Sequence, residues 1–149
     1  MCAWLSKLAS IVGVEPGEIR PLDISEGDAL RERGIPDDAR VGWVGEIEAL
    51  GVLAASVASA AGGVPAALFL STHDELGGLV LPAERWCAAA HQLLQLDGDG
   101  VIVRSLDGRC GFVVDIIDPT PFERMNRPEV QRFEWRVWGD AWVPACGTV

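Results

Sequence analysis

The strongest constraint on the fold lies after Gly100, where two runs of alternating residues flank Asp107-Gly108. Both runs, 101–106 and 110–117, are rich in the Val, Ile and Phe that favour β-strands. An Asp-Gly pair between such runs predicts a two-residue hairpin turn, because both central positions favour positive φ. We therefore expect an antiparallel hairpin whose inner face carries Val101, Val103, Ser105, Cys110, Phe112, Val114 and Ile116.

A second hairpin is predicted from the runs 130–138 and 141–145, which meet at Gly139-Asp140. Alternation assigns its core face to Phe133, Trp135 and Val137, joined across the turn by Trp142 and Pro144. The opposite face carries Arg136 and Trp138, which places Trp138 on the outer face near the tip of this hairpin. There it is either exposed, or covered by the N-terminal helix or the Pro-rich loop, or stacked on Arg136. Exposed Trp and Arg side chains are enriched in protein-binding hot spots.

Helical spacing and helix-stop residues organise the chain before Gly100. The predicted helices cover 2–12, 26–33, 45–61 and 82–96, and the predicted strands cover 40–44, 66–71 and 79–81. We expect one α+β domain over residues 1–149, in two layers. Its N-terminal and central helices pack on a mainly antiparallel sheet, and the two hairpins form the C-terminal part of that sheet.

One segment, 49–72, carries no charge over 24 residues and is long enough to span a bilayer. Its content is mostly Ala, Gly, Ser and Val, which gain little on transfer into lipid. Gly62-Gly63-Val64-Pro65 interrupts it, and acidic residues flank it on both sides. We therefore expect a buried helix, a turn and a strand, and no membrane span.

The charge of the chain limits its partners. It holds 22 acidic against 12 basic residues, a net charge of −10, and the segment 15–48 alone holds ten acids against four arginines. Such a field repels phosphate backbones and speeds association with basic proteins. The simpler interpretation is a solvated surface that keeps a small domain soluble. We expect a basic protein partner and no direct nucleic-acid binding.

The cysteines and histidines offer two candidate chemical sites. Cys87 and His91 lie one turn apart on a predicted helix, as in the start of a metal site. Cys110 and His73 form a second possible thiol–histidine pair. The other two cysteines are Cys2 and Cys146, no C-x-x-C pair occurs, and residues 1–14 lack the features of a secretory signal. We therefore expect a cytoplasmic protein with free thiols and no metal or cofactor.

The motifs of nucleotide-binding proteins, metalloproteases and serine hydrolases do not occur in the sequence. The sequence predicts a small acidic protein-binding protein that blocks a basic partner, such as an inhibitor or immunity-type protein or an effector chaperone. The alternative is a small thiol- or metal-dependent enzyme that uses Cys87/His91 or Cys110/His73. The predicted interaction residues are Asp37, Asp38, Glu46, Glu48, Arg136 and Trp138.

Overall fold

The computed structural model describes residues 2–118, 121, 125 and 132–144. They form helices and one seven-stranded antiparallel sheet, which confirms the predicted α+β class. In chain order the elements are α1 (Cys2–Val12), η1 (Pro16–Glu18), β1 (Arg20–Pro21), α2 (Ile24–Glu32), β2 (Arg40–Val44), α3 (Ile47–Ala61), β3 (Pro65–Leu70), η2 (Asp74–Leu76), β4 (Leu79–Pro82), α4 (Ala83–Asp97), β5 (Gly100–Ser105), β6 (Gly111–Ile117) and β7 (Arg132–Trp138).

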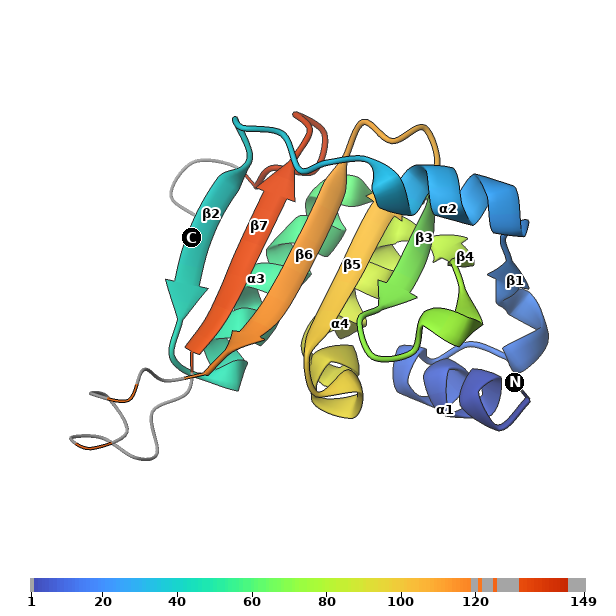
Figure 1. Cartoon of the computed structure of the whole chain (residues 1–149), viewed down its shortest axis with the longest axis horizontal. Coiled ribbons are helices and arrows are strands. Elements are labelled where there is room, and N and C mark those ends of the chain that lie inside the picture. The colour runs from blue at the N-terminus through green and yellow to red at the C-terminus, as the bar shows by residue number, and fades with distance from the viewer. Residues whose placement is uncertain (1, 119–120, 122–124, 126–131, 145–149) are drawn as a thin grey trace.

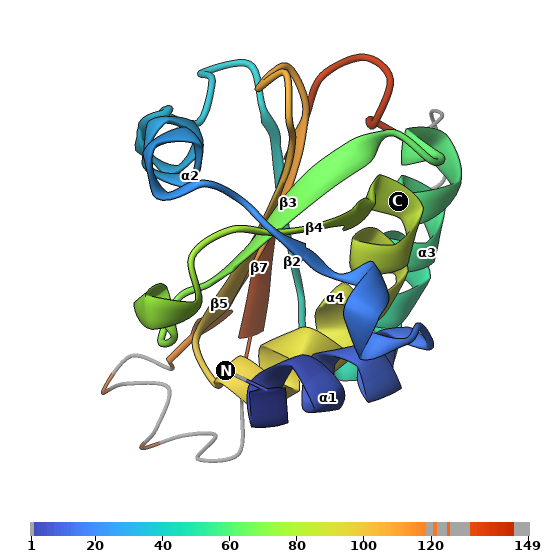
Figure 2. The same cartoon turned by 90° about the vertical axis from the view of Figure 1, so that its right-hand side faces the viewer.

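The strand order is β1-β4-β3-β5-β6-β7-β2, so two strands far apart in the sequence, β2 and β7, are neighbours at one end of the sheet (Figure 1). Helices α1, α3 and α4 lie on one side of the sheet, and α2 lies on the other (Figure 2). The main core fills the space between α1, α3, α4 and the sheet. We call the opposite side, which faces the viewer in Figure 1, the outer face.

The outer face is covered unevenly. A small second core joins Leu30 of α2 to Ala67 and Phe69 of β3, with Ile102 and Leu106 packed against it. Helix α2 therefore covers the sheet over β3 and β5. The outer face of β6, β7 and β2 lies beyond this helix (Figure 1). This is a departure from the predicted two layers, in which all helices shared one side.

The predicted helices are confirmed to within two residues at each end. The uncharged segment 49–72 contains most of α3, a turn and β3, as expected. Helix α3 ends where Gly62 takes a φ of 65°, and α4 ends where Gly98 takes a left-handed φ of 83°. Within the part of the chain that the structure describes, no helix has both the length and the apolar character that a membrane crossing requires.

The first hairpin is confirmed, with Val101 opposite Val114 and Val103 opposite Phe112 on the core side. Its turn is longer than the predicted two residues, because Ser105 pairs with Cys110 and residues 106–109 form the loop. Only Gly108 has a positive φ in this loop. The Ser105 hydroxyl donates to Asp107 Oδ1 at 2.6 Å and accepts the Cys110 N–H at 3.0 Å, which stabilises the wider turn.

The prediction of a second hairpin is wrong. Strand β7 pairs with β6 on one side and with β2 on the other, so β2 occupies the position that a returning strand would need. Residues 141–144 form a turn instead, in which the N–H groups of Trp142 and Val143 donate to the Gly139 carbonyl. Residues 130, 131 and 145 of the predicted hairpin lie outside the described residues.

Candidate interaction surface

The four predicted acidic residues are exposed but do not form one patch. Asp37 and Asp38 precede β2, whereas Glu46 and Glu48 follow it. A strand of this length separates its two ends by about 15 Å. The acidic residues therefore bracket β2, one pair at each end.

Of the alternatives for Trp138, exposure is wrong, because this side chain is only 3% exposed. Its ring lies directly over Gly111 of β6, which has no side chain to hold it off, and the Arg104 guanidinium stacks at 5.1 Å from the ring. The neighbouring strands therefore bury Trp138 on the outer face. Arg136 stays partly exposed, but Glu134 neutralises its charge through an ion pair of 3.0 Å.

Trp43 is an exposed aromatic residue that was not among the predicted interaction residues. It is 59% exposed and stands on the outer face of β2 beside Val41, which is 45% exposed. Gly42, between them, faces the core, where the Trp135 ring packs against it. The available signal was the alternation within 40–44, but it could not show that this strand lies at an edge of the sheet.

Carboxylates continue this surface across the sheet. The strand registers place Trp43 opposite Glu134, and Glu134 opposite Asp115, in one row on the outer face. Partial burial, followed by repulsion from Glu134 and Asp99, raises the pKa of Asp115, and the nearby Arg136 only partly offsets this. Burial is the main cause of this rise, and repulsion adds to it because Glu134 and Asp99 are acidic neighbours of Asp115.

A buried hydrogen-bond cluster surrounds Asp97, at the lower end of the sheet in Figure 1. Its fully buried side chain accepts hydrogen bonds from the Thr72 hydroxyl at 2.7 Å, the Thr72 N–H at 3.1 Å and the Gly100 N–H at 3.0 Å. His73 Nδ1 lies 3.0 Å from the same carboxylate, and its ring packs against Trp4. Burial raises the pKa of Asp97, but these hydrogen bonds outweigh it and lower the pKa.

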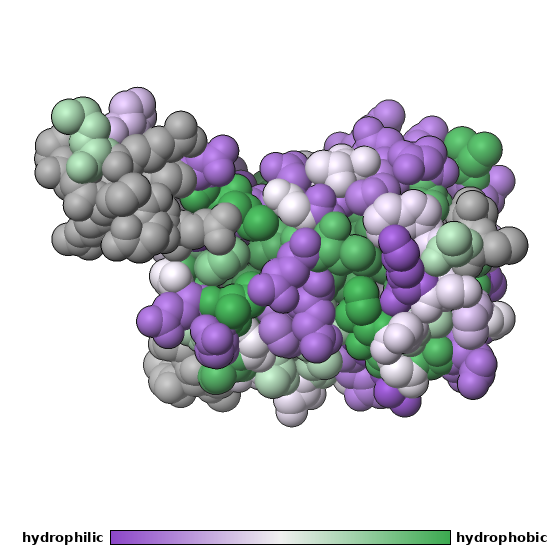
Figure 3. Space-filling view, turned by 90° about the horizontal axis from the view of Figure 1, so that it is seen from below, coloured by the Kyte–Doolittle hydropathy of each residue, from purple (hydrophilic) through white to green (hydrophobic). Residues whose placement is uncertain are grey.

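The Asp97 cluster ties the end of α4 to the loop after β3 and to the start of β5. Because these hydrogen bonds hold three segments of the chain together, we assign the cluster a structural role. The described residues on the surface at this end of the molecule include interspersed hydrophobic and hydrophilic side chains (Figure 3).

The pair Cys87 and His91 belongs to the core of the helical layer. Cys87 is fully buried, and its burial raises the pKa of the thiol to about 12, which leaves almost no reactive thiolate at neutral pH. The His91 ring packs on Gly51 of α3, and burial lowers its pKa. Among the described residues, no group of three or more His, Cys, Asp or Glu side chains is arranged to hold a metal ion.

The pair Cys110 and His73 is not brought together. Cys110 bonds to Ser105 at one end of β5, whereas the loop that carries His73 is bonded to Gly100 at the other end. The length of this strand separates them by about 16 Å. Burial and then the nearby Asp107 raise the pKa of the Cys110 thiol, which further lowers its reactivity. The burial of Cys87 and the separation of Cys110 from His73 therefore argue against both predicted thiol–histidine pairs as nucleophilic sites.

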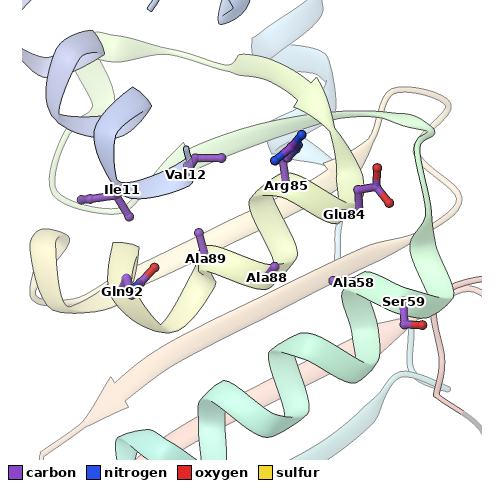
Figure 4. Close-up of a pocket in the computed structure, with 9 residues that line it drawn as sticks. All are labelled: Ile11, Val12, Ala58, Ser59, Glu84, Arg85, Ala88, Ala89 and Gln92. Atoms are coloured by element: carbon purple, nitrogen blue, oxygen red, sulfur yellow. The ribbon is translucent and has the colours of Figure 1, made fainter. Parts of the chain in front are cut away.

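Several hollows lie elsewhere on the surface of the described residues, and two of them are each about 400 Å³. One is an open groove of about 390 Å³ over α4, between α1 and α3, where alanines leave space; its lining residues are those labelled in Figure 4. The other, of about 400 Å³, lies between α2 and the loop before β4, with Phe69 at its base. The Arg31 guanidinium stacks on Phe69 at 4.9 Å and lies 3.8 Å from Asp74, so the chain's own cation fills part of this hollow.

Comparison with protein-family models, with curated proteins and with solved structures gave no match to this chain. We therefore infer a function from the geometry and charge of the described residues.

Proposed function

We propose that this chain is a small acidic cytoplasmic protein that binds a basic protein partner and blocks it, as an immunity-type inhibitor or an effector chaperone does. The observation that carries the proposal is the exposure of Trp43. This large aromatic side chain is 59% exposed on β2, an edge strand of the sheet. Tryptophan is among the residues most enriched at the energetic centre of protein interfaces. Val41 beside it extends the apolar contact.

The charge around Trp43 supports a basic partner. Asp37 and Asp38 lie before β2, and Glu46 and Glu48 lie after it, so acidic residues border the aromatic residue along the strand. Glu134 and Asp115 extend a row of carboxylates from Trp43 across the outer face of the neighbouring strands. Acidic residues around an apolar centre steer a basic protein into contact and disfavour acidic competitors. The net charge of −10 also opposes binding to nucleic acid or to anionic lipid.

The test is capture of partners from a lysate of the source cells at low and at high salt, with identification by mass spectrometry. Four forms are compared: the natural chain, Trp43→Ala, the double reversal Asp37→Lys/Asp38→Lys, and the double reversal Glu26→Lys/Glu32→Lys. The last is a matched control, because it makes the same change in net charge at exposed positions of α2. We expect the natural chain and the control to capture one basic protein, more weakly at high salt.

Trp43→Ala and Asp37→Lys/Asp38→Lys are expected to weaken this capture by about tenfold or more, since truncation of a hot-spot residue costs at least about 1–2 kcal/mol. Equal capture by all four forms would show that the surface around β2 is not the binding site. If no basic protein is captured at either salt concentration, the proposed function itself is refuted.

A further inference from the structure

The two edges of the sheet differ in their capacity to accept another strand. Strand β1 at one edge has only two residues, and its Pro21 has no N–H to donate, so this edge is blunted. Strand β2 at the other edge has five residues and no proline. In the described part of the chain its only strand partner is β7. The outer edge of β2 therefore presents backbone N–H and C=O groups that no described strand pairs.

The side chains of β2 suit an added strand. Val41 and Trp43 stand together on the outer face, whereas Gly42 lies on the core side against Trp135. A strand paired with β2 would run about 4.8 Å away, with every second side chain on the outer face. Its outer-face residues would pack beside Val41 and Trp43, and aliphatic or aromatic residues give the most favourable cross-strand contacts there.

Charge decides between a second copy of the chain and a foreign segment. Antiparallel pairing of two β2 strands about Gly42 would set Asp38 of each copy beside Glu46 of the other. A parallel pairing would set Asp38 beside Asp38. Like charges opposite one another oppose pairing, and each copy also carries a net charge of −10. A segment with basic residues is instead attracted to the same acidic groups.

We infer that β2 binds an extended, basic segment of the partner as an added strand of the sheet. Backbone hydrogen bonds to β2 hold the segment, alternate apolar side chains pack on Val41 and Trp43, and lysine or arginine side chains reach the acidic residues at the two ends of the strand. This inference rests on the proposed function and specifies how the same surface recognises its partner.

The test uses two synthetic peptides of about nine residues, the length of a long natural strand. One alternates Lys and Val throughout. The other has the same charge, but prolines replace the two central valines and remove their N–H donors. Binding is measured by isothermal titration calorimetry, which serves the natural chain and its Trp43 variant alike, and amide hydrogen exchange is followed residue by residue with NMR.

We expect the alternating peptide to slow exchange of the amides in β2 by about tenfold or more at saturation, because new hydrogen bonds protect them. The proline peptide should bind about tenfold more weakly and leave β2 unprotected. Trp43→Ala should weaken binding of the alternating peptide, whereas Val52→Ala should not. Val52 is a suitable control because it is an exposed aliphatic residue on α3.

Equal binding of both peptides without protection of β2 would overturn strand addition, since contact would then be electrostatic alone. Protection of β2 that rises with protein concentration in the absence of peptide would assign the edge to a second copy and would also overturn it. Either result leaves capture of a basic protein from lysate intact, so the failure of this inference is distinguishable from failure of the proposed function.

Discussion

At the scale of single residues, two carboxylates show how opposite environments arise within one sheet. Asp97 is enclosed by donors from Thr72, His73 and Gly100, which lower its pKa despite its burial. Asp115 is partly buried beside Glu134 and Asp99, and both burial and repulsion raise its pKa. The ionised form is therefore favoured by folding at Asp97 and disfavoured at Asp115.

Replacement of Asp97 by Asn should lower the free energy of unfolding at neutral pH by about 1–3 kcal/mol, because charged hydrogen bonds are lost in a buried site. The folded-state pKa of Asp97 is lowered, so its stabilising contribution is present above the ordinary carboxyl pKa and is lost as the pH falls through the lowered value. The difference between Asp97→Asn and the natural chain should therefore shrink on acidification. Urea unfolding at a series of pH values measures it.

Asp115→Asn is the matched variant, for which we expect the opposite change in the free energy of unfolding. The pKa of Asp115 is raised, so its ionisation opposes folding at neutral pH, and this cost disappears as the pH falls below the ordinary carboxyl pKa. Asp115→Asn should therefore stabilise the chain at neutral pH and have little effect in acid. Parallel pH profiles for the two variants would contradict these assignments.

At the scale of elements, tryptophan rings pack over glycines of neighbouring strands and so connect β6, β7 and β2. The Trp138 ring covers Gly111 on the outer face, between β7 and β6, and the Trp135 ring covers Gly42 on the core face, between β7 and β2. A glycine in a strand weakens it locally, and a ring from the neighbouring strand restores the lost packing. The two pairs lie on opposite faces, as the alternation along β7 requires.

Gly111→Ala should lower the free energy of unfolding by about 1–3 kcal/mol, the usual cost of overpacking. The new Cβ would overlap Trp138 Cζ2, so the ring must leave its place between Gly111 and Arg104. Chemical denaturation measures the change. Gly45→Ala is the control, because nothing lies within 4 Å of its Cβ position, and a similar loss in both variants would refute the packing explanation.

At the scale of the whole molecule, the distribution of six tryptophans can be compared with the charge around them. Trp86, Trp135, Trp138 and Trp142 are buried, and Trp4 is partly exposed with the Lys7 ammonium 5.1 Å from its ring centroid. Trp43 is the most exposed, and acidic residues border it at both ends of β2. A cation in solution should therefore reach Trp43 more readily than an anion does.

Fluorescence quenching tests the negative charge around Trp43 in the absence of a partner. At low ionic strength, caesium should quench the accessible fluorescence about twofold more effectively than iodide, each normalised to its quenching of free N-acetyltryptophanamide. Trp43→Phe should abolish this preference, because the remaining accessible ring, Trp4, lies beside Lys7. A preference for caesium that persists in Trp43→Phe would mean that another tryptophan is exposed to the acidic field.

The sequence by itself determined the elements and the faces of most strands. Helix periodicity and the stops at Gly62 and Gly98 are local properties, and so is the alternation that assigns Val103 and Val114 to the core side. These signals depend on residues a few positions apart, which is why the helices and the first hairpin were correctly predicted. The turn at Asp107 was longer than predicted, because the Ser105 side chain competes for the backbone groups that close it.

Only the tertiary structure decided which strand lies at the edge of the sheet. Pairing of β2 with β7 joins segments about ninety positions apart, and no local pattern specifies such a contact. That pairing removed the predicted second hairpin, and the approach of β6 and Arg104 buried Trp138. It also left Trp43 exposed on an outermost strand with acidic residues at both ends. The exposure of a strand residue depends on what lies across the sheet, and that is set by long-range packing.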